Sequence, residues 1–113
     1  MPRYLISFDD GAMTFPEEDL PAVADAAHAV VQEAMDAGAW VFGGGLNPHE
    51  DVTVVASDGK VTDGPTSKAY IGGLWVVDVP SREKALEWAA KTAVACRCAQ
   101  EVREFMPDPA VGN

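Results

Sequence analysis

The sequence predicts a single two-layer α+β domain in which two helices cover one face of an antiparallel sheet. Three observations lead to this prediction. The chain has 113 residues, the common size of one domain, and 48% of them are hydrophobic. Two segments have the apolar spacing of amphipathic helices. Short runs of β-branched and aromatic residues surround them, and the major elements follow the order β-α-β-β-α-β, with an extra short strand near Trp40.

The first half of the chain begins with a strand and a long helix. Residues 3–8 predict a strand that turn residues end at 9–11. Residues 14–17 have the Thr-x-x-Glu spacing of a capping box, which indicates a short helical turn, and Pro21 fits only a first turn. The main helix is expected from Asp19 or Leu20 to Ala37, with Gly38 as its left-handed cap. Its apolar stripe is Leu20, Val23, Ala24, Ala27, Val30, Val31 and Ala34, and its polar stripe is Asp25, His28, Gln32 and Asp36.

The second half contains a hairpin, a buried strand and a second helix. The short apolar run 39–42 precedes three glycines that permit bulges or close backbone approach. Strands at 52–57 and 60–63 flank Asp58-Gly59, a strong hairpin signal. A loop then ends near residue 69, and 70–79 predict a long buried strand that Pro80 ends. Ser81 caps a helix from 82 to about 92, whose sheet-facing residues are expected to be Leu86, Ala89, Ala90 and Ala93. Residues 100–105 predict the last strand, and 107–113 a frayed tail.

Two helices leave one face of the sheet uncovered. Side chains alternate along a strand, so Tyr4, Phe8, Trp75 and Val77 are not all expected to face the helices. The uncovered face is therefore expected to bury itself against a second copy of the chain, which predicts a homodimer.

The charge balance excludes several partners. The net charge is −10, from 18 acidic and 8 basic residues, and residues 1–56 hold ten acids against the single base Arg3. This argues against nucleic acid and against an anionic membrane surface. No apolar segment is long enough to span a membrane, and the N-terminal residues do not resemble a signal peptide, so the cytoplasm is expected. A solvated face is the simpler interpretation of the acids; a docking face for a cationic partner is the alternative.

No cofactor and no metal are expected. Cys96 and Cys98 are two residues apart, a spacing at which side chains in a strand would point the same way and a disulfide rarely has normal geometry. Reduced thiols are the simpler interpretation. A metal pair would need His28 and His49 as further ligands, and the spacing is not that of a zinc finger. Residues 43–45 lack the Lys-Ser/Thr ending of a phosphate loop.

Several segments in order resemble the YCII-related family, and more narrowly its branch named for an Asp-Gly-Pro-Phe motif. These segments are 61–65, 72–79 and 85–90, with support from 37–38, 43–46 and 101–103, so the resemblance covers roughly residues 3–105. It implies one YCII-related domain over 1–113 with a ferredoxin-like fold, of the dimeric α/β-barrel type that pairs sheet to sheet. It also implies a bacterial, intracellular protein in a stress or regulatory setting. The activity of such proteins is largely unknown, although a shared His and Asp have suggested an enzyme.

This sequence departs from the branch pattern after Asp63-Gly64-Pro65. The branch continues with Phe and then Ala-Glu-Thr-Lys-Glu, whereas this chain has a loop about two residues shorter and without those acids. Residues 91–96 also lack the Asp-Pro that single-domain relatives carry. Only the helix histidine of the family has a counterpart here, which is His28.

The residues that could carry chemistry are few. His28 shares a helix face with Asp25 and Gln32, and a carboxylate neighbour would raise its basicity. Asp63 is a candidate partner for His28 across a cleft, where the two could move a proton next to a carbonyl group. Ser7, Tyr70 and Gln32 are candidate ligand-binding residues. The simpler interpretations are a surface histidine, a turn-forming aspartate and a packed sheet face.

These residues lead to two hypotheses about function. The first is a small-molecule-binding or regulatory homodimer without catalysis. The alternative is an isomerase- or lyase-type enzyme with His28 and Asp63 in a pocket near the dimer interface. A catalytic site should show His28 and a carboxylate converging in a partly apolar pocket with shifted pKa values.

Overall fold

The structure is a computed structural model and describes residues 2–63 and 70–113. Its strands are β1 (Arg3–Asp9), β2 (Trp40–Gly45), β3 (Thr53–Val55), β4 (Val61–Asp63), β5 (Ile71–Asp78) and β6 (Glu101–Glu104). Its helices are α1 (Leu20–Asp36) and α2 (Arg82–Cys96), with short 3-10 turns η1 (Glu17–Asp19), η2 (His49–Asp51) and η3 (Pro109–Val111). The loop predicted over 64–69 lies outside the described residues. Neither helix is long and apolar enough to cross a membrane, within the part of the chain described.

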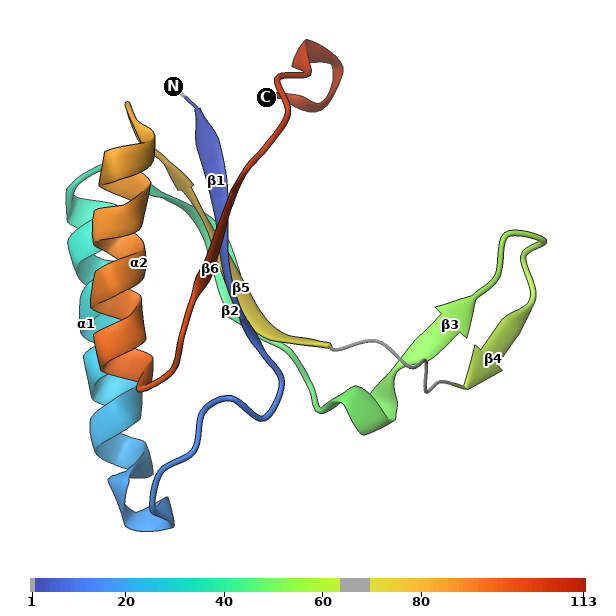
Figure 1. Cartoon of the computed structure of the whole chain (residues 1–113), viewed down its shortest axis with the longest axis horizontal. Coiled ribbons are helices and arrows are strands. Elements are labelled where there is room, and N and C mark those ends of the chain that lie inside the picture. The colour runs from blue at the N-terminus through green and yellow to red at the C-terminus, as the bar shows by residue number, and fades with distance from the viewer. Residues whose placement is uncertain (1, 64–69) are drawn as a thin grey trace.

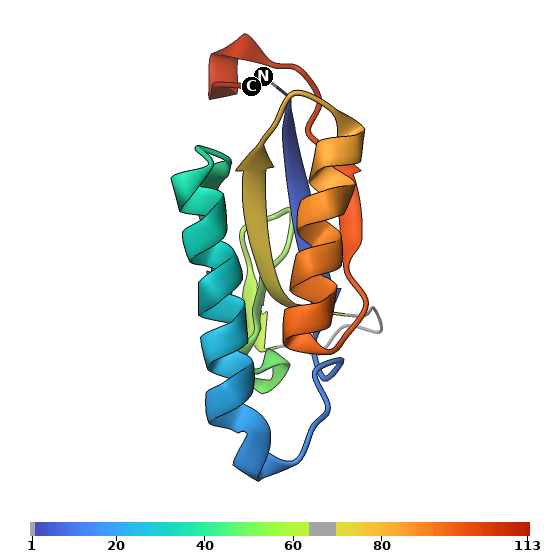
Figure 2. The same cartoon turned by 90° about the vertical axis from the view of Figure 1, so that its left-hand side faces the viewer.

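Four strands form the main sheet in the order β2-β5-β1-β6, with every neighbouring pair antiparallel. Both helices lie side by side on one face of this sheet (Figures 1 and 2). The predicted two-layer α+β class is therefore confirmed. The short strand near Trp40, predicted as an extra, is one of the four sheet strands. The predicted hairpin instead forms a separate two-stranded sheet, β3-β4, which projects away from the helices (Figure 1).

The helix ends follow the predicted chemistry in most places. Gly38 ends α1 with φ 71°, and the Ser81 hydroxyl accepts a hydrogen bond from the Lys84 backbone N–H at 3.2 Å. The capping box predicted at 14–17 was wrong, because η1 begins after Pro16 and no side chain caps it. The second helix is four residues longer than predicted. Cys96 is thus its last residue.

Arg97 joins the end of α2 to the start of α1. Arg97 follows α2 in the left-handed region, with φ 58°, and its guanidinium lies 2.8 Å from the Asp19 carboxylate at the start of α1. The Arg97 side chain also lies over the Phe15 ring. A left-handed non-glycine residue is uncommon, and here the ion pair and the ring contact hold it in place.

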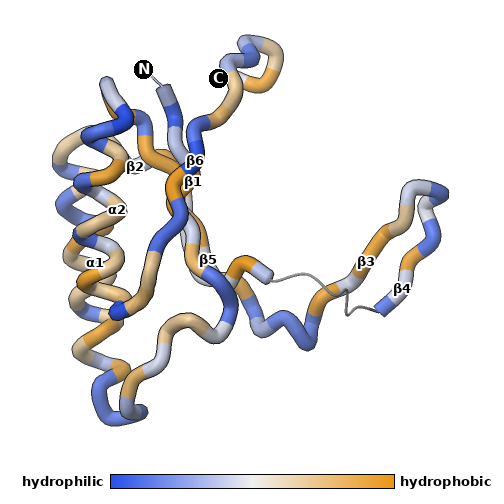
Figure 3. The backbone as a smooth tube through the Cα atoms, in the orientation of Figure 1, coloured by the Kyte–Doolittle hydropathy of each residue, from blue (hydrophilic) through white to orange (hydrophobic). Residues whose placement is uncertain are grey.

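The core lies between the sheet and the helices. Tyr4, Ile6, Trp75 and Val77 project from the sheet into it, and each is at most 6% exposed. The expectation that Tyr4, Phe8, Trp75 and Val77 could not share the helix side was wrong, because β1 and β5 pair in a register that places all four there. The helices contribute alanines in return, and Figure 3 shows these apolar stretches facing the sheet. Leu86, predicted to face the sheet, is 37% exposed, whereas Trp88 packs against the core.

The opposite face of the sheet is open in the chain. Alternation places Leu5, Ser7, Leu74 and Val76 on this face, and Phe42 pairs with Val76 beside them. Phe42 is 67% exposed. The projecting β3-β4 hairpin and the C-terminal turn lie at the two ends of this open face (Figure 1).

Glycines allow β2 to approach β5 closely. A Cβ on Gly43 would lie 2.4 Å from the Trp75 Cβ and 2.8 Å from the Leu74 carbonyl oxygen. A Cβ on Gly73 would lie 2.5 Å from the Phe8 ring. These separations are far below van der Waals contact, so the predicted close backbone approach at 43–45 occurs at Gly43. Gly44, by contrast, has open space where a Cβ would stand.

The substitution Gly43→Ala should therefore destabilise the fold. The added methyl group must displace the backbone of β5, and overpacking of this kind costs about 1–3 kcal/mol of unfolding free energy. Gly44→Ala is the matched control and should change stability little. Urea unfolding of both variants measures the difference, and equal stability of the two would contradict the close approach.

Candidate functional site

A cleft of about 440 Å³ lies between the helices and the sheet. Its walls are mainly apolar. Phe8, Trp40 and Trp75 supply aromatic surface from the sheet, and α1 supplies Ala27, Val30 and Val31. Concave, largely apolar cavities of this size are typical of small-molecule sites.

The cleft exists because small residues surround large aromatic ones. The Trp75 ring lies between Trp40, at 5.7 Å between ring centroids, and Trp88, at 6.2 Å in an edge-on arrangement. On the β2 side, Gly43, Gly44 and Gly45 carry no side chains to fill the space beside Trp75. The three tryptophans therefore form one wall, and the glycines leave the hollow next to it.

Two buried polar atoms belong to residues that line this cleft. The Trp75 Nε1 and the Gln100 Oε1 are both buried and have no hydrogen-bond partner in the described part of the chain. The Gln100 Nε2 donates to the Cys98 carbonyl oxygen at 3.4 Å, which fixes the amide with its oxygen as the remaining group. A buried polar group without a partner costs about 1–3 kcal/mol. Both atoms lie beneath the surface of residues that line the cleft.

The titratable groups of the cleft are His28 and Cys96. His28 is exposed at the rim, and Cys96 is buried at the end of α2. Burial raises the pKa of the Cys96 thiol, so the thiol stays protonated at neutral pH. Lys, Arg, Asp and Glu are absent from the described residues that line the cleft. Its interior is accordingly uncharged.

The predicted site residues do not gather in one place. Neither a hydrogen bond nor an ion pair joins His28 to a carboxylate among the described residues, and Gln32 instead donates to Asp36 at 3.0 Å. Asp63 is exposed at the end of β4, in the separate hairpin. Ser7 is 7% exposed on the open face of the sheet, between β5 and β6. The structure thus places His28 at the cleft and leaves Asp63, Ser7 and Gln32 away from it.

A histidine–aspartate pair does occur, at another position. The His49 Nδ1 lies 2.7 Å from the Asp10 Oδ2, which also accepts the His49 backbone N–H at 2.9 Å. The His49 ring stacks on Tyr70, with 5.4 Å between ring centroids and 8° between planes. The Glu50 carboxylate lies 3.4 Å from the His49 Nε2. Asp10 therefore orients the ring and leaves Nε2 as the outward nitrogen.

The sheet topology brings this pair together. Because β1 and β2 both run antiparallel to β5, their ends lie beside the start of β5. Asp10 donates its backbone N–H to the Tyr70 carbonyl oxygen at 2.7 Å, and Leu46 donates to that of Gly72 at 2.9 Å. A Cβ on Gly72 would lie 2.8 Å from the Asp10 Cα. The sequence shows Asp10 and His49 after separate strands, and the strand order that joins them is not apparent from either segment alone.

Electrostatics within the pair favour its charged form. The hydrogen bond that His49 donates to the Asp10 carboxylate raises the pKa of His49, with a smaller contribution from the Glu50 charge. The same hydrogen bond lowers the pKa of the Asp10 carboxyl. His49 therefore stabilises the fold at acidic pH and loses this effect as pH rises through its raised pKa, whereas Asp10 loses its effect as pH falls through its lowered pKa. The pair is strongest between those two values.

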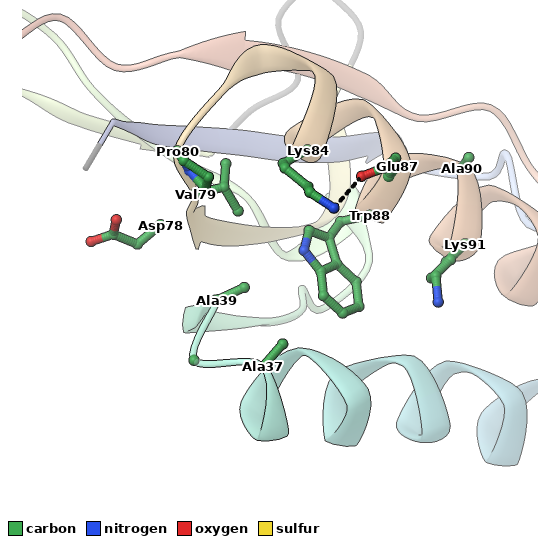
Figure 4. Close-up of a pocket in the computed structure, with 11 residues that line it drawn as sticks. Ala37, Ala39, Asp78, Val79, Pro80, Lys84, Glu87, Trp88, Ala90 and Lys91 are labelled. Atoms are coloured by element: carbon green, nitrogen blue, oxygen red, sulfur yellow. Dashed lines mark ion pairs between the residues drawn. The ribbon is translucent and has the colours of Figure 1, made fainter.

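A larger hollow than the cleft lies at the other end of the sheet. It measures about 660 Å³ and is centred on Trp88, between the end of α1 and the start of α2 (Figure 4). Its charged groups already have partners: Lys84 pairs with Glu87 at 3.1 Å, and Lys91 pairs with Glu33. This hollow therefore offers less unused binding capacity than the cleft beside Trp75. In the described chain, no three His, Cys, Asp or Glu side chains converge as metal ligands.

The chain is a two-layer α+β domain with a mainly apolar cleft between its helices and its sheet. The sequence profile of the YCII-related domain matches residues 5–107, and the chain belongs to this family. The structure is similar to that of 5-chloro-2-hydroxyhydroquinone dehydrochlorinase from Burkholderia phenoliruptrix AC1100, solved in complex with 2,5-dihydroxybenzoquinone. The TM-score is 0.50 and the identity 12%, over 96% of this chain and 97% of that one, so the likeness concerns the fold. A comparison of the chain with curated protein sequences finds no match.

The substitution Asp10→Asn should lower the pKa of His49. It replaces the charged acceptor that favours the imidazolium form, so the ring should titrate at lower pH than in the wild type. Glu50→Gln is the control and should lower the pKa less, because Glu50 is more distant and 70% exposed. NMR titration of the histidine ring resonances measures the pKa of His49 in both variants. His28 is the other histidine in each sample. An unchanged His49 titration in Asp10→Asn would contradict the pairing.

Proposed function

We propose that this chain binds a small, largely apolar molecule in the cleft beside Trp75. The observation that carries the proposal is the cleft of about 440 Å³, whose walls are mainly apolar and include the rings of Phe8, Trp40 and Trp75. Such walls bury the apolar surface of a ligand and stack on an aromatic ring. Binding by this means requires no cofactor.

The similar dehydrochlorinase structure supports this proposal only in a general way. Its ligand, 2,5-dihydroxybenzoquinone, is a planar ring with carbonyl and hydroxyl groups. Since this likeness shows the fold alone, binding in this chain is proposed from its own cleft.

We also propose that the chain forms a homodimer through the open face of its sheet. Leu5, Leu74, Val76 and Phe42 form an apolar patch there, and Phe42 is 67% exposed in the single chain. The β3-β4 hairpin and the C-terminal turn border this face, where they would contact a second copy of the chain (Figure 1). The Asp-Gly-Pro-Phe branch and a cytoplasmic location, expected from the sequence, stay predictions.

The alternative function is an isomerase- or lyase-type enzyme that uses a His/Asp pair. The sequence predicts this role for His28 and Asp63; the geometry that favours it is the Asp10–His49 pair, in which the His49 side chain is 46% exposed and its Nε2 lies 3.4 Å from the Glu50 carboxylate. A base oriented in this way can transfer a proton. If a cleft ligand is recovered chemically unchanged, the result favours binding. If the wild type converts the ligand and His49→Gln does not, the result favours the enzyme.

A cleft ligand should be detectable by thermal shift, because a molecule that binds only the folded state raises the melting temperature. In a screen of neutral aromatic metabolites, at least one should raise the melting temperature of the wild type. Ala27→Leu fills the cleft from α1 and should abolish the shift. Ala22→Leu, at an exposed position on the same helix, is the matched control and should retain it. The same shift in both variants would place the ligand elsewhere.

Replacing Phe42 with glutamate should separate the homodimer. Phe42 is exposed in the single chain, so Phe42→Glu should leave the fold intact while placing a charge in the proposed interface. Sedimentation velocity should show a dimer for the wild type and a monomer for the variant. Val94→Glu, at an 80% exposed site on α2, is the control and should stay dimeric. A wild-type chain that is a stable monomer in dilute solution would contradict this proposal.

A further inference from the structure

We infer that the β3-β4 hairpin is a dimerisation arm: its valines dock in a groove beside the C-terminal turn of a second copy of the chain, and its Asp63 pairs with Arg103 of that copy. This inference rests on the proposed homodimer and adds the contact that sets how the two copies are oriented. It gives Asp63 a role in assembly rather than in catalysis.

The hairpin receives little support from its own chain. Its two strands form a sheet of their own, which projects away from the helices (Figure 1). A two-stranded hairpin without further packing is only marginally stable in water. The radius of gyration of the chain is 15.6 Å, whereas a compact domain of this length has about 13 Å. An arm of this kind is expected to gain stability when another surface covers it.

One face of the hairpin is suited to such a contact. Val55 pairs with Val61 across the two strands, so both side chains lie on the same face, where they are 64% and 67% exposed. Asp63 lies two residues after Val61 and shares this face. It is exposed, and no ion pair joins it to another described residue. The face therefore has an apolar centre with a carboxylate beside it.

The open face of the main sheet offers a complementary groove. The groove measures about 510 Å³ and lies between β6 and the C-terminal turn, with apolar walls from Leu5, Phe105, Met106 and Val111. Arg103 also lines it and is paired with Leu5 across the sheet, so the two side chains lie on the same open face. Arg103 is exposed and forms no ion pair within the described part of the chain. The groove thus combines an apolar surface with an available cation.

Charge indicates which ends of the two copies meet. The hairpin follows β2, at the end of the sheet where the loops 9–13 and 46–52 contain no Lys or Arg and carry four acids: Asp9, Asp10, Glu50 and Asp51. Arg3 and Arg103 lie towards the opposite end. Pairing like ends would place acids against acids, whereas pairing opposite ends places each acidic end against the arginines of the other copy. We therefore expect opposite ends to meet.

This orientation creates the same contact twice. A two-fold interface uses the same surfaces on both copies, so each hairpin reaches the groove of the other copy. Burial of the exposed valines against the groove supplies affinity, because it removes apolar surface from water. The Asp63–Arg103 pairs favour this orientation over the alternative in which like ends meet.

Charge reversal tests the pairing. Asp63→Arg and Arg103→Asp should each raise the dissociation constant of the dimer about 10-fold or more, because each places like charges together at both contacts. The double variant exchanges the two charges and should recover most of the lost affinity. Asp25→Arg makes the same charge change at an exposed site on α1 and should keep the wild-type constant. Sedimentation equilibrium measures all five proteins.

A second substitution tests the apolar part of the contact. Val61→Thr keeps a β-branched side chain but brings a hydroxyl group into the groove, so it should raise the dissociation constant about 3- to 10-fold. Val94→Thr, at an exposed site on α2, is the matched control and should leave it unchanged. If a charge variant does not fold, the comparison of Val61→Thr with Val94→Thr decides.

The outcomes separate this inference from the proposed homodimer. A wild-type chain that stays monomeric overturns both. A dimer that keeps its dissociation constant in the two charge reversals, or in Val61→Thr, retains the homodimer and overturns the arm contact. A double variant that recovers no affinity also overturns the inference, since the losses in the single variants then do not come from a contact between Asp63 and Arg103.

Discussion

The structure depends on how Trp75 packs among small residues. Its ring lies between Trp40 and Trp88 in a core where the helices contribute Ala34, Ala85 and Ala89. Gly43 is required beside it, because a Cβ there would collide with Trp75. The sheet therefore supplies the large side chains and the helices supply the small ones. That division lets two alanine-rich helices lie close to the sheet, and it leaves the hollow beside Trp75 unfilled on the glycine side.

The same strand, β5, connects this core to both candidate sites. Trp75 supplies aromatic surface to the cleft wall. Further towards the start of the strand, Gly72 leaves room for the backbone of Asp10, and its carbonyl oxygen accepts the backbone N–H of Leu46 on the chain that leads from β2 to His49. The cleft has apolar and aromatic walls, while the Asp10–His49 pair has shifted pKa values. Binding is therefore best supported at the first site, and proton transfer at the second.

Much of the fold could be predicted from local signals. Gly38, Asp58-Gly59 and Ser81 each act where turn and cap chemistry place them. The errors came from long-range packing: the register of β1 on β5 put Trp75 and Tyr4 on one face, and α2 continued to Cys96. The site was harder to predict. His28 was found at the cleft rim by its helix position, but neither the buried Gln100 oxygen nor the contact between Asp10 and His49 has a signal within one segment of sequence.

The cleft beside Trp75 is the proposed ligand site. The most direct measurement follows the indole N–H resonances of the three tryptophans by NMR while the metabolite with the largest thermal shift is added, with Trp75→Phe used to assign the Trp75 signal. A ligand ring stacked on the aromatic wall should shift the Trp75 resonance with saturation, and by more than that of Trp88, which does not line the cleft. A saturating ligand that leaves the Trp75 indole resonance unmoved would contradict the proposed site.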